Sequence, residues 1–296
     1  MKVDTRKILS AFLIVVMLVS VLPSAALADA DMRRVVVGAD LNEEQIASVY
    51  QLFGIQRGDV AELRLTNAEE HAALDGYLDK AVIGTRSMSC VFLELLPQGS
   101  GMTVNVQNVS WCTPEMYRSA LVTGGLTDAR ITVAAPFPVS GTAALAGIYK
   151  AYEYMTGQKL DTAAKDISTQ ELTITGELAN EIGSDDSTSI VNELKQMLNE
   201  TVNMSDEELR TQIQKIAAGY GVNLTESQVQ RLVELCRSLE KLNPDALTQR
   251  VDDLQSTLEK VSEAKDQVVG FMQTMKRVFQ SIRDFMDKVS SLFDGR

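Results

Sequence analysis

The pattern of hydrophobic and polar residues predicts alternating strands and helices from Met32 to about Gly157. Arg33–Gly38 is a β-branched run typical of a strand, and in 61–65 apolar residues alternate with charged ones, as in a half-buried strand. The other elements are expected at 42–53, 67–78, 113–124 and 140–154 for helices, and at 88–96, 102–111 and 129–135 for strands. The order β-α-β-α-β-β-α-β-α predicts an α/β fold, a mixed sheet with packed helices.

The strands 88–96 and 102–111 are predicted to pair as a hairpin about the turn 97–101. In that register Cys90 lies about 13 Å along the strand from a position opposite Cys112, whereas a disulfide needs α-carbons about 6 Å apart. Three cysteines are also too few for a disulfide framework. We therefore expect Cys90 and Cys112 to be buried thiols rather than a bridge, and Cys236, which lies in an apolar stripe, to belong to the core.

After Gly157 the strand patterns fade, and helices are predicted at about 187–199, 206–218 and 226–242. Three helix starts in the chain combine a capping box with a hydrophobic staple: a capping residue is followed three residues later by Glu or Gln, and both are flanked by hydrophobic residues. The capping residues are Asn42, Ser205 and Thr225. Asn243-Pro244 then starts a final helix, so an all-α region should follow the α/β domain.

The final helix carries an apolar stripe at alternating steps of four and three residues. The stripe residues are Leu247, Val251, Leu254, Leu258, Val261, Val268, Met272, Met275, Phe279, Ile282, Met286, Val289 and Phe293. Only Lys265 interrupts this 3.5-residue repeat, which predicts a long amphipathic helix with coiled-coil-like, left-handed packing.

Three interpretations of this stripe remain open. The helices of 187–242 could fold back over it, making it ordinary core. The second half could instead be an association face for another copy or another envelope protein, formed by Met272, Met275, Phe279, Ile282, Met286, Val289 and Phe293. Residues 270–296 also hold five basic and three acidic residues, as in a helix that lies on a membrane surface.

The N-terminus has the three parts of a secretory signal peptide. A basic region with Lys2, Arg6 and Lys7 precedes the uncharged apolar stretch 8–22, and Ala26-Leu27-Ala28 fits the cleavage rule. We expect a secreted, extracytoplasmic protein that begins at Asp29. The expected divisions are a signal peptide, 1–28; an α/β domain, 29–157; a helical region, 158–242; and the long helix, 243–296.

The charge of the chain argues against nucleic acid as a partner. Residues 1–28 hold three of the 28 basic and one of the 40 acidic residues, which leaves 25 basic and 39 acidic residues and a net charge of −14 from Asp29 onward. A field of that sign repels polyanions.

The sequence lacks the residues that most catalytic mechanisms require. His71 is the single histidine, and with three scattered cysteines no zinc site has enough ligands. We expect neither a metal nor a cofactor, because no phosphate-binding or dinucleotide-binding loop is present. Ser-x-x-Lys occurs at Ser238–Lys241 and Ser262–Lys265, without the partner motifs of penicillin-binding enzymes. A pair of acidic side chains for glycoside hydrolysis stays open, because such pairing depends on spatial arrangement.

The turn Ser140-Gly141-Thr142, between the last strand and the next helix, has ligand-binding potential. The start of a helix presents free N–H groups and a partial positive charge, and anionic ligands bind at this end of strands in α/β sheets. The alternative is that these small residues only let the helix pack closely on the sheet, with Ser140 as a plain cap.

Three stretches resemble the YpuA-like family, secreted proteins of Gram-positive bacteria with a domain of unknown function. They are Thr66-Asn67-Ala68-Glu69-Glu70, residues 83–89 (IGTRSMS) and residues 133–145 (VAAPFPVSGTAAL). The resemblance implies a cell-envelope setting and supplies no catalytic or binding residues. We therefore expect a non-enzymatic binding or scaffolding protein with a helical association arm. The alternative is a carboxylate-dependent hydrolase that acts on wall polymer.

Overall fold

The computed structural model describes residues 32–78 and 80–257. By their contacts the residues up to Val251 form one compact unit, and Asp252 begins a second. The predicted signal peptide, 1–28, and the predicted association face between Met272 and Phe293 lie outside the described residues. None of the helices within the described ranges is both long and apolar enough to cross a membrane.

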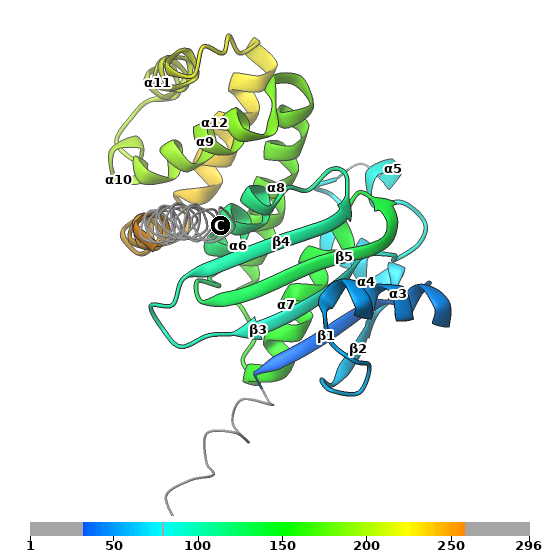
Figure 1. Cartoon of the computed structure of the whole chain (residues 1–296). Coiled ribbons are helices and arrows are strands. Elements are labelled where there is room, and N and C mark those ends of the chain that lie inside the picture. The colour runs from blue at the N-terminus through cyan, green and yellow to red at the C-terminus, as the bar shows by residue number, and fades with distance from the viewer. Residues whose placement is uncertain (1–31, 79, 258–296) are drawn as a thin grey trace, which may run out of the picture. The chain divides into compact units, whose positions relative to one another are not determined.

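Five strands form one mixed sheet in the order β2-β1-β3-β5-β4 (Figure 1). The strands are β1 (Arg33–Gly38), β2 (Glu62–Leu65), β3 (Cys90–Leu95), β4 (Met102–Val109) and β5 (Ala129–Val139). The pairs β1–β2 and β4–β5 are parallel, and the pairs β1–β3 and β3–β5 are antiparallel. The predicted mixed sheet with packed helices is confirmed.

The predicted hairpin of β3 and β4 is wrong, because β5 lies between these strands. Residue Cys90 pairs with Ala134 of β5, and β4 pairs with the other edge of β5, from Met102 opposite Ala129 onward. The physical reason is burial: β5 is apolar over most of its length and is buried at Ile131, Val133 and Ala134. Such a strand is most stable in the sheet interior, where both of its edges are paired.

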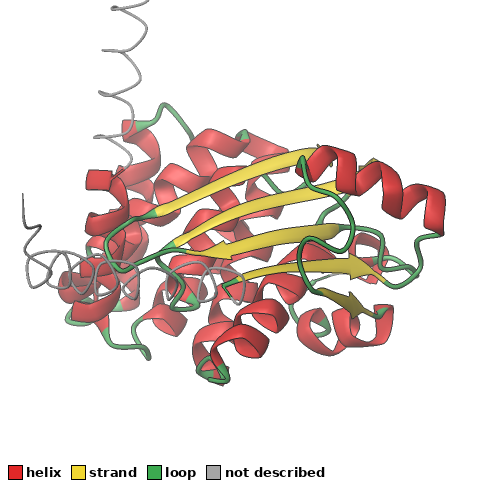
Figure 2. Cartoon of the chain, turned by 60° about the horizontal axis from the view of Figure 1, so that its bottom comes forward, coloured by secondary structure: helices red, strands yellow, loops and turns green. Residues whose placement is uncertain are grey.

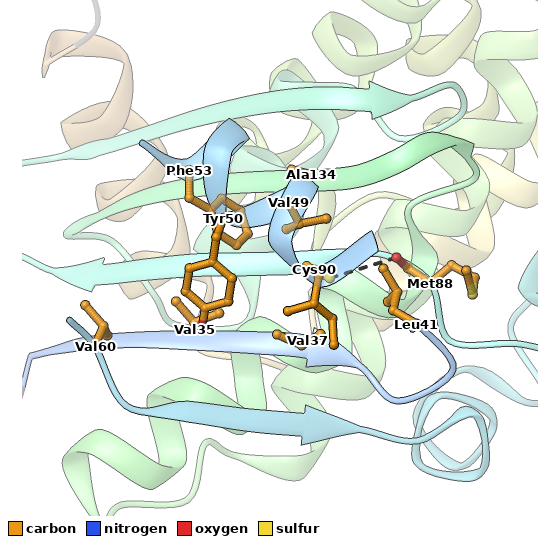
Figure 3. Close-up of a cluster of buried hydrophobic side chains, with 11 residues drawn as sticks. Val35, Val37, Leu41, Val49, Tyr50, Phe53, Val60, Met88, Cys90 and Ala134 are labelled. Atoms are coloured by element: carbon orange, nitrogen blue, oxygen red, sulfur yellow. Dashed lines mark hydrogen bonds between the residues drawn. The ribbon is translucent and has the colours of Figure 1, made fainter. Parts of the chain in front are cut away.

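Helices pack on both faces of this sheet (Figure 2). Helix α3 (Glu43–Phe53) covers one face, where Val35 and Val37 of β1 contact its buried side chains (Figure 3). Helix α7 (Thr142–Thr156) covers the other face, where Val36 lies beside Gly147. The alternation of Val35, Val36 and Val37 between two apolar layers explains why β1 contains three consecutive valines.

All three cysteines are free thiols and buried, as expected. Burial raises the pKa of Cys90, Cys112 and Cys236 to about 12, which keeps them as thiols at neutral pH. The expectation was right, although the hairpin register used to reach it was not. Cys90 faces the α3 layer.

The structure confirms the local capping predictions. All three predicted capping boxes are present, at α3, α11 (Asp206–Gly219) and α12 (Glu226–Leu239), and a fourth starts α4 (Asn67–Leu74) at Thr66. Thr113 caps α6 (Pro114–Thr123), as expected. The expected helix 67–78 ends early at Leu74 and is followed by the short α5 (Lys80–Ile83). Helices α9 (Ser184–Gln196) and α10 (Leu198–Thr201) precede α11.

The longest helix among the described residues, α8 (Thr162–Ile182), was not predicted. Its buried side chains include many hydroxyls, among them Ser168, Thr169, Thr173 and Thr175, so no apolar stripe marks it. The hydroxyls of Thr169 and Thr173 donate to carbonyls four residues earlier, at 3.0 and 2.9 Å. Threonine is buried in a helix at low cost when its hydroxyl bonds back in this way.

The final helix begins where it was predicted. The backbone N–H of Ala246 donates to the Asn243 side chain at 3.0 Å, and residues 244–257 are helical. Leu247 and Val251, the first two stripe residues, are buried. The coiled-coil-like continuation from Leu258 lies outside the described residues and stays a prediction.

Candidate functional site

A pocket of about 350 Å³ is lined by residues from the end of β5, the start of α7, α4 and α5. Its wall consists of Glu70 from α4, residues 81–86 with Met88 and Ser89, and Phe137 with residues 139–143. All three stretches that carry the family resemblance contribute to this wall. The predicted turn Ser140-Gly141-Thr142 therefore belongs to a larger site.

The turn is held by hydrogen bonds from neighbouring segments. Backbone N–H groups of Ser110 and Cys112 donate to the carbonyls of Val139 and Ser140, at 2.8 and 3.1 Å. The buried hydroxyl of Tyr117 donates to the Gly141 carbonyl at 2.5 Å. These contacts fix the direction in which α7 begins.

Helix α7 starts without a side-chain cap. Its N-cap residue is Gly141, whose φ of 96° is left-handed, and no side chain caps the first turn. The interpretation of Ser140 as a plain cap is therefore wrong: its Oγ lies 3.2 Å from the Thr142 hydroxyl instead. Left-handed φ suits glycine, and an uncapped first turn leaves N–H groups available to an acceptor from outside the chain.

Glu70 is the residue of this site that sequence reasoning missed. It is 1% exposed, and its Oε1 accepts a hydrogen bond from the Thr142 hydroxyl at 2.8 Å. Its other oxygen, Oε2, is buried and has no hydrogen-bond partner among the described residues. Burial raises the pKa of Glu70 to about 7, and the side chains of Thr142 and Asn67, which favour the ionised form, offset only part of that rise. Buried polar atoms are normally paired, so this oxygen indicates a missing partner.

Two exposed side chains complete the pocket wall. Arg86 is exposed, and no described carboxylate forms a salt bridge with it. Phe137 is an exposed aromatic residue from the end of β5. The pocket thus combines a helix N-terminus, one guanidinium, one buried carboxyl group, hydroxyls and an apolar ring.

His71 lies next to the pocket but does not line it. Its Nδ1 lies 2.8 Å from the Asp75 carboxylate, and its Nε2 lies 3.0 Å from the Gly84 carbonyl. The hydrogen bond to Asp75 raises the pKa of His71. Because both partners are acceptors, both ring nitrogens donate in the cationic form of the ring. His71 therefore ties α4 to the segment after α5.

A Ser–Lys contact exists elsewhere, at residues that the Ser-x-x-Lys motifs did not indicate. The Lys195 ammonium lies 2.7 Å from Ser119 Oγ and 2.9 Å from Glu171 Oε1. Exposure of Ser119, Lys195 and Glu171 is at most 2%, and none of them lines the pocket. A nucleophile needs access to its substrate, so this cluster is structural: it joins α6, α8 and α9.

The described ranges contain no candidate metal site. No group of three or more His, Cys, Asp or Glu side chains that could hold a metal occurs there. Ser238 and Lys241 lie at the end of α12, where the Lys241 N–H donates to the Ser238 carbonyl at 3.1 Å. Ser262 and Lys265 lie outside the described residues.

Comparison with known proteins agrees with the resemblance carried by the pocket segments. The sequence model of a family described as "Protein of unknown function (DUF1002)" matches residues 37–261. The chain is 33% identical over 285 residues, 95% of each chain, to "Uncharacterized protein YpuA" of Bacillus subtilis (strain 168). No solved structure matches the chain. The match over most of the chain shows that this protein belongs to the DUF1002 family.

Proposed function

We propose that this protein binds a small acidic ligand in the pocket at the start of α7. The observation that carries the proposal is the partnerless Oε2 of buried Glu70, next to the uncapped first turn of α7. A helix N-terminus attracts anions through its free N–H groups and its partial positive charge. Arg86 adds a full positive charge at the same wall, and guanidinium groups bind carboxylate, sulfate and phosphate oxygens well.

The size and charge of the site favour a small ligand over a polymer. A pocket of about 350 Å³ is at the lower end of small-molecule sites. The negative charge of the chain repels extended polyanions. The ring of Phe137 supplies an apolar surface for the uncharged part of the ligand, such as the face of a sugar ring.

The hydrolase alternative has one observation in its favour. Burial raises the pKa of Glu70 to about 7, and a general acid that works near neutral pH needs such a value. Glycoside hydrolysis by two carboxyl groups needs a second one about 5–10 Å away. Glu70 is the one carboxyl group among the described residues that line the pocket, so binding is the better-supported function.

The first prediction is that acidic ligands stabilise the purified protein against heat. At a ligand concentration of about 100 times Kd, the stabilisation is about 2.7 kcal/mol, which raises the Tm of a protein of this size by about 5–10 °C. Sulfate, phosphate and acidic sugars are screened by thermal shift.

Variants in the same thermal-shift experiment test whether the ligand binds in this pocket. Arg86→Gln should weaken binding at least about tenfold, and Ser140→Ala/Thr142→Val should remove it while the protein stays folded. The matched control is Arg130→Gln, which removes an exposed arginine paired with Glu94. Equal shifts in wild type and Arg86→Gln, or no shift with any ligand, would refute binding here. New reducing ends released from wall polymer by wild type but not by Glu70→Gln would favour the hydrolase.

We further propose that the protein works outside the cytoplasmic membrane, because residues 1–28 carry a signal-peptide pattern. Protein recovered from culture supernatant or wall should begin at Asp29 in mass spectrometry. A chain that keeps Met1 in the membrane fraction would contradict both the cleavage and the location. The association arm likewise stays a proposal, since its residues lie outside the described ones.

A further inference from the structure

We propose that the α7 pocket binds its anion together with one proton, which Glu70 carries on Oε2. This inference rests on the proposed function, because it concerns the same ligand. It adds that binding is coupled to pH through a single carboxyl group. The step is a protonation only, and the proton comes from the solvent.

The geometry leaves Oε2 as the atom that can hold this proton. The Thr142 hydroxyl donates to Oε1 at 2.8 Å, so that oxygen already has a donor. The Ser140 hydroxyl lies 3.2 Å from Thr142 Oγ1, and since Thr142 gives its own proton to Glu70, Ser140 is the donor of that pair. The Ser140 and Thr142 hydroxyls thus form a hydrogen-bonded chain that ends at Oε1, and the Asn67 side chain also favours the ionised carboxylate. Oε2 has no hydrogen-bond partner among the described residues. A protonated Oε2 is itself a donor, so the partner that it lacks is an acceptor, such as an oxygen of the bound anion.

Glu70 and the bound anion would repel each other if both were charged. Both contact the first turn of α7, through Thr142 for Glu70 and through the free N–H groups for the ligand. Glu70 is 1% exposed, so water screens its charge little, and two like charges in such a site interact strongly. When like charges share a site, one of them is normally neutralised by a proton. The ligand can be an anion over the whole pH range, so Glu70 takes the proton.

The charged groups around Glu70 do not cancel the rise in its pKa that burial causes. Those that interact with it electrostatically are His71 and Asp40, and also Cys112 and Tyr117, whose pKa values are raised by burial. His71 lowers the pKa of Glu70 and Asp40 raises it.

The lysines of the helices that contact α4 are either paired with another carboxylate or exposed to solvent. Lys150 of α7 pairs with Glu69, and Lys165 of α8 pairs with Glu153, while Lys80 of α5 is exposed. Arg86 remains for the ligand. Burial therefore dominates, and Glu70 changes its charge near pH 7.

The sign of the pH dependence follows from linkage. Below about pH 7 Glu70 is already neutral, so the affinity for an anion is constant. Above that pH the free protein has lost the proton that the complex keeps, and the affinity falls about tenfold per pH unit. Because linkage is reciprocal, ligand binding raises the pKa of Glu70, and the protein takes up one proton when it binds at pH 8.

Sulfate is the probe, because it stays a dianion between pH 5.5 and 8.5 and adds no titration of its own. Calorimetry on the purified protein, in buffers of different ionisation heat, gives Kd and the number of protons taken up. We expect a constant Kd from pH 5.5 to 7, a rise of about tenfold from pH 7.5 to 8.5, and uptake of nearly one proton at pH 8.

Variants assign the proton to its residue. Glu70→Gln keeps the shape and cannot ionise, so its Kd at pH 8.5 should equal that of wild type at pH 5.5, with no proton uptake. Glu44→Gln, an exposed acid in α3, is the control and should keep the wild-type profile. His71 would give a dependence of the same sign, so His71→Gln is compared: a profile that flattens there but not in Glu70→Gln overturns the inference.

The outcomes separate the two proposals. Sulfate binding that is flat with pH in wild type, without proton uptake, overturns the proton coupling and leaves the binding site standing. If sulfate, phosphate and acidic sugars all fail to bind at any pH, in wild type and in Glu70→Gln, the proposed function falls and the coupling with it. Should Glu70→Gln fail to fold, His71→Gln still decides: proton uptake at pH 8 that persists there supports Glu70, and uptake that disappears overturns the inference.

Discussion

Lys195→Met should lower the free energy of unfolding by about 3–5 kcal/mol, as is typical when one partner of a buried ion pair is removed. Lys195 is completely buried, and its ammonium lies 2.9 Å from Glu171 Oε1. Without it, the Glu171 carboxylate would remain buried with hydroxyl partners only. Urea denaturation followed by circular dichroism measures the loss.

Each charge in this cluster is supported by hydrogen bonds. The Lys195 ammonium also donates to the Ser119 carbonyl at 3.0 Å, and Glu171 accepts from Ser119 and Thr123, both at 2.5 Å. Burial lowers the pKa of Lys195, and the charge of Glu171 opposes that shift. The cluster connects α6, α8 and α9, so its loss should loosen the contact between the sheet-covering helices and the helical region.

A double variant separates the ion pair from general packing. Lys195→Met/Glu171→Gln leaves no buried charge and keeps the shape, so it should be more stable than Lys195→Met alone. Lys165→Met is the control, because its pair with Glu153 is partly exposed and such pairs contribute about 0–1 kcal/mol. A loss below about 1 kcal/mol for Lys195→Met would mean that the ion pair does not stabilise this junction.

Gly141→Ala should destabilise the protein by about 2–5 kcal/mol, the sum of backbone strain and overpacking. Its φ of 96° lies in the left-handed region. An added Cβ would also lie 2.5 Å from Val109 Cγ1 and 2.6 Å from the Tyr117 hydroxyl. Tyr117 is fully buried and bonded to the Gly141 carbonyl, so it cannot retreat without breaking that bond. The variant should also lose the thermal shift with ligand, because the start of α7 must move.

Gly157→Ala is the matched control for this change. Gly157 ends α7 with a φ of 66° and has no atom near the added Cβ. It should cost only about 1–2 kcal/mol, the penalty of left-handed backbone for alanine. Urea denaturation of both variants gives the comparison. Equal losses at the two positions would show that the clash with Val109 and Tyr117 is relieved, and that the turn is less rigid than its hydrogen bonds indicate.

Local structure was predictable from the sequence wherever it depends on a few adjacent residues. The capping boxes at Asn42, Ser205 and Thr225, and the cap at Thr113, formed as predicted, because a cap needs only a side chain and an N–H group three residues later. The strand and helix order of the α/β domain also followed from periodicity. Helix α8 was missed for a related reason: Glu171 and four hydroxyl-bearing residues interrupt the apolar residues on its buried face.

Strand pairing was decided only by the tertiary structure. Sequence proximity favours a hairpin of β3 and β4, whereas the fold gains more by burying β5 between them. That gain comes from the helices that cover the sheet, and no local pattern contains it. The free, buried thiols of Cys90 and Cys112 were expected correctly, yet the register behind that expectation changed with the strand order.

In the candidate site, too, some residues could be identified from the sequence and others only from the fold. The turn at Ser140, Gly141 and Thr142 could be singled out from its residue types and its place after a strand. Glu70 could not, because along the sequence it is one of two adjacent acids in an acidic helix start. Glu69 is exposed and paired with Lys150, whereas Glu70 is buried against Thr142. Which of two adjacent carboxyl groups loses its water depends on which side of α4 packs against α7, and that is a property of the assembled fold.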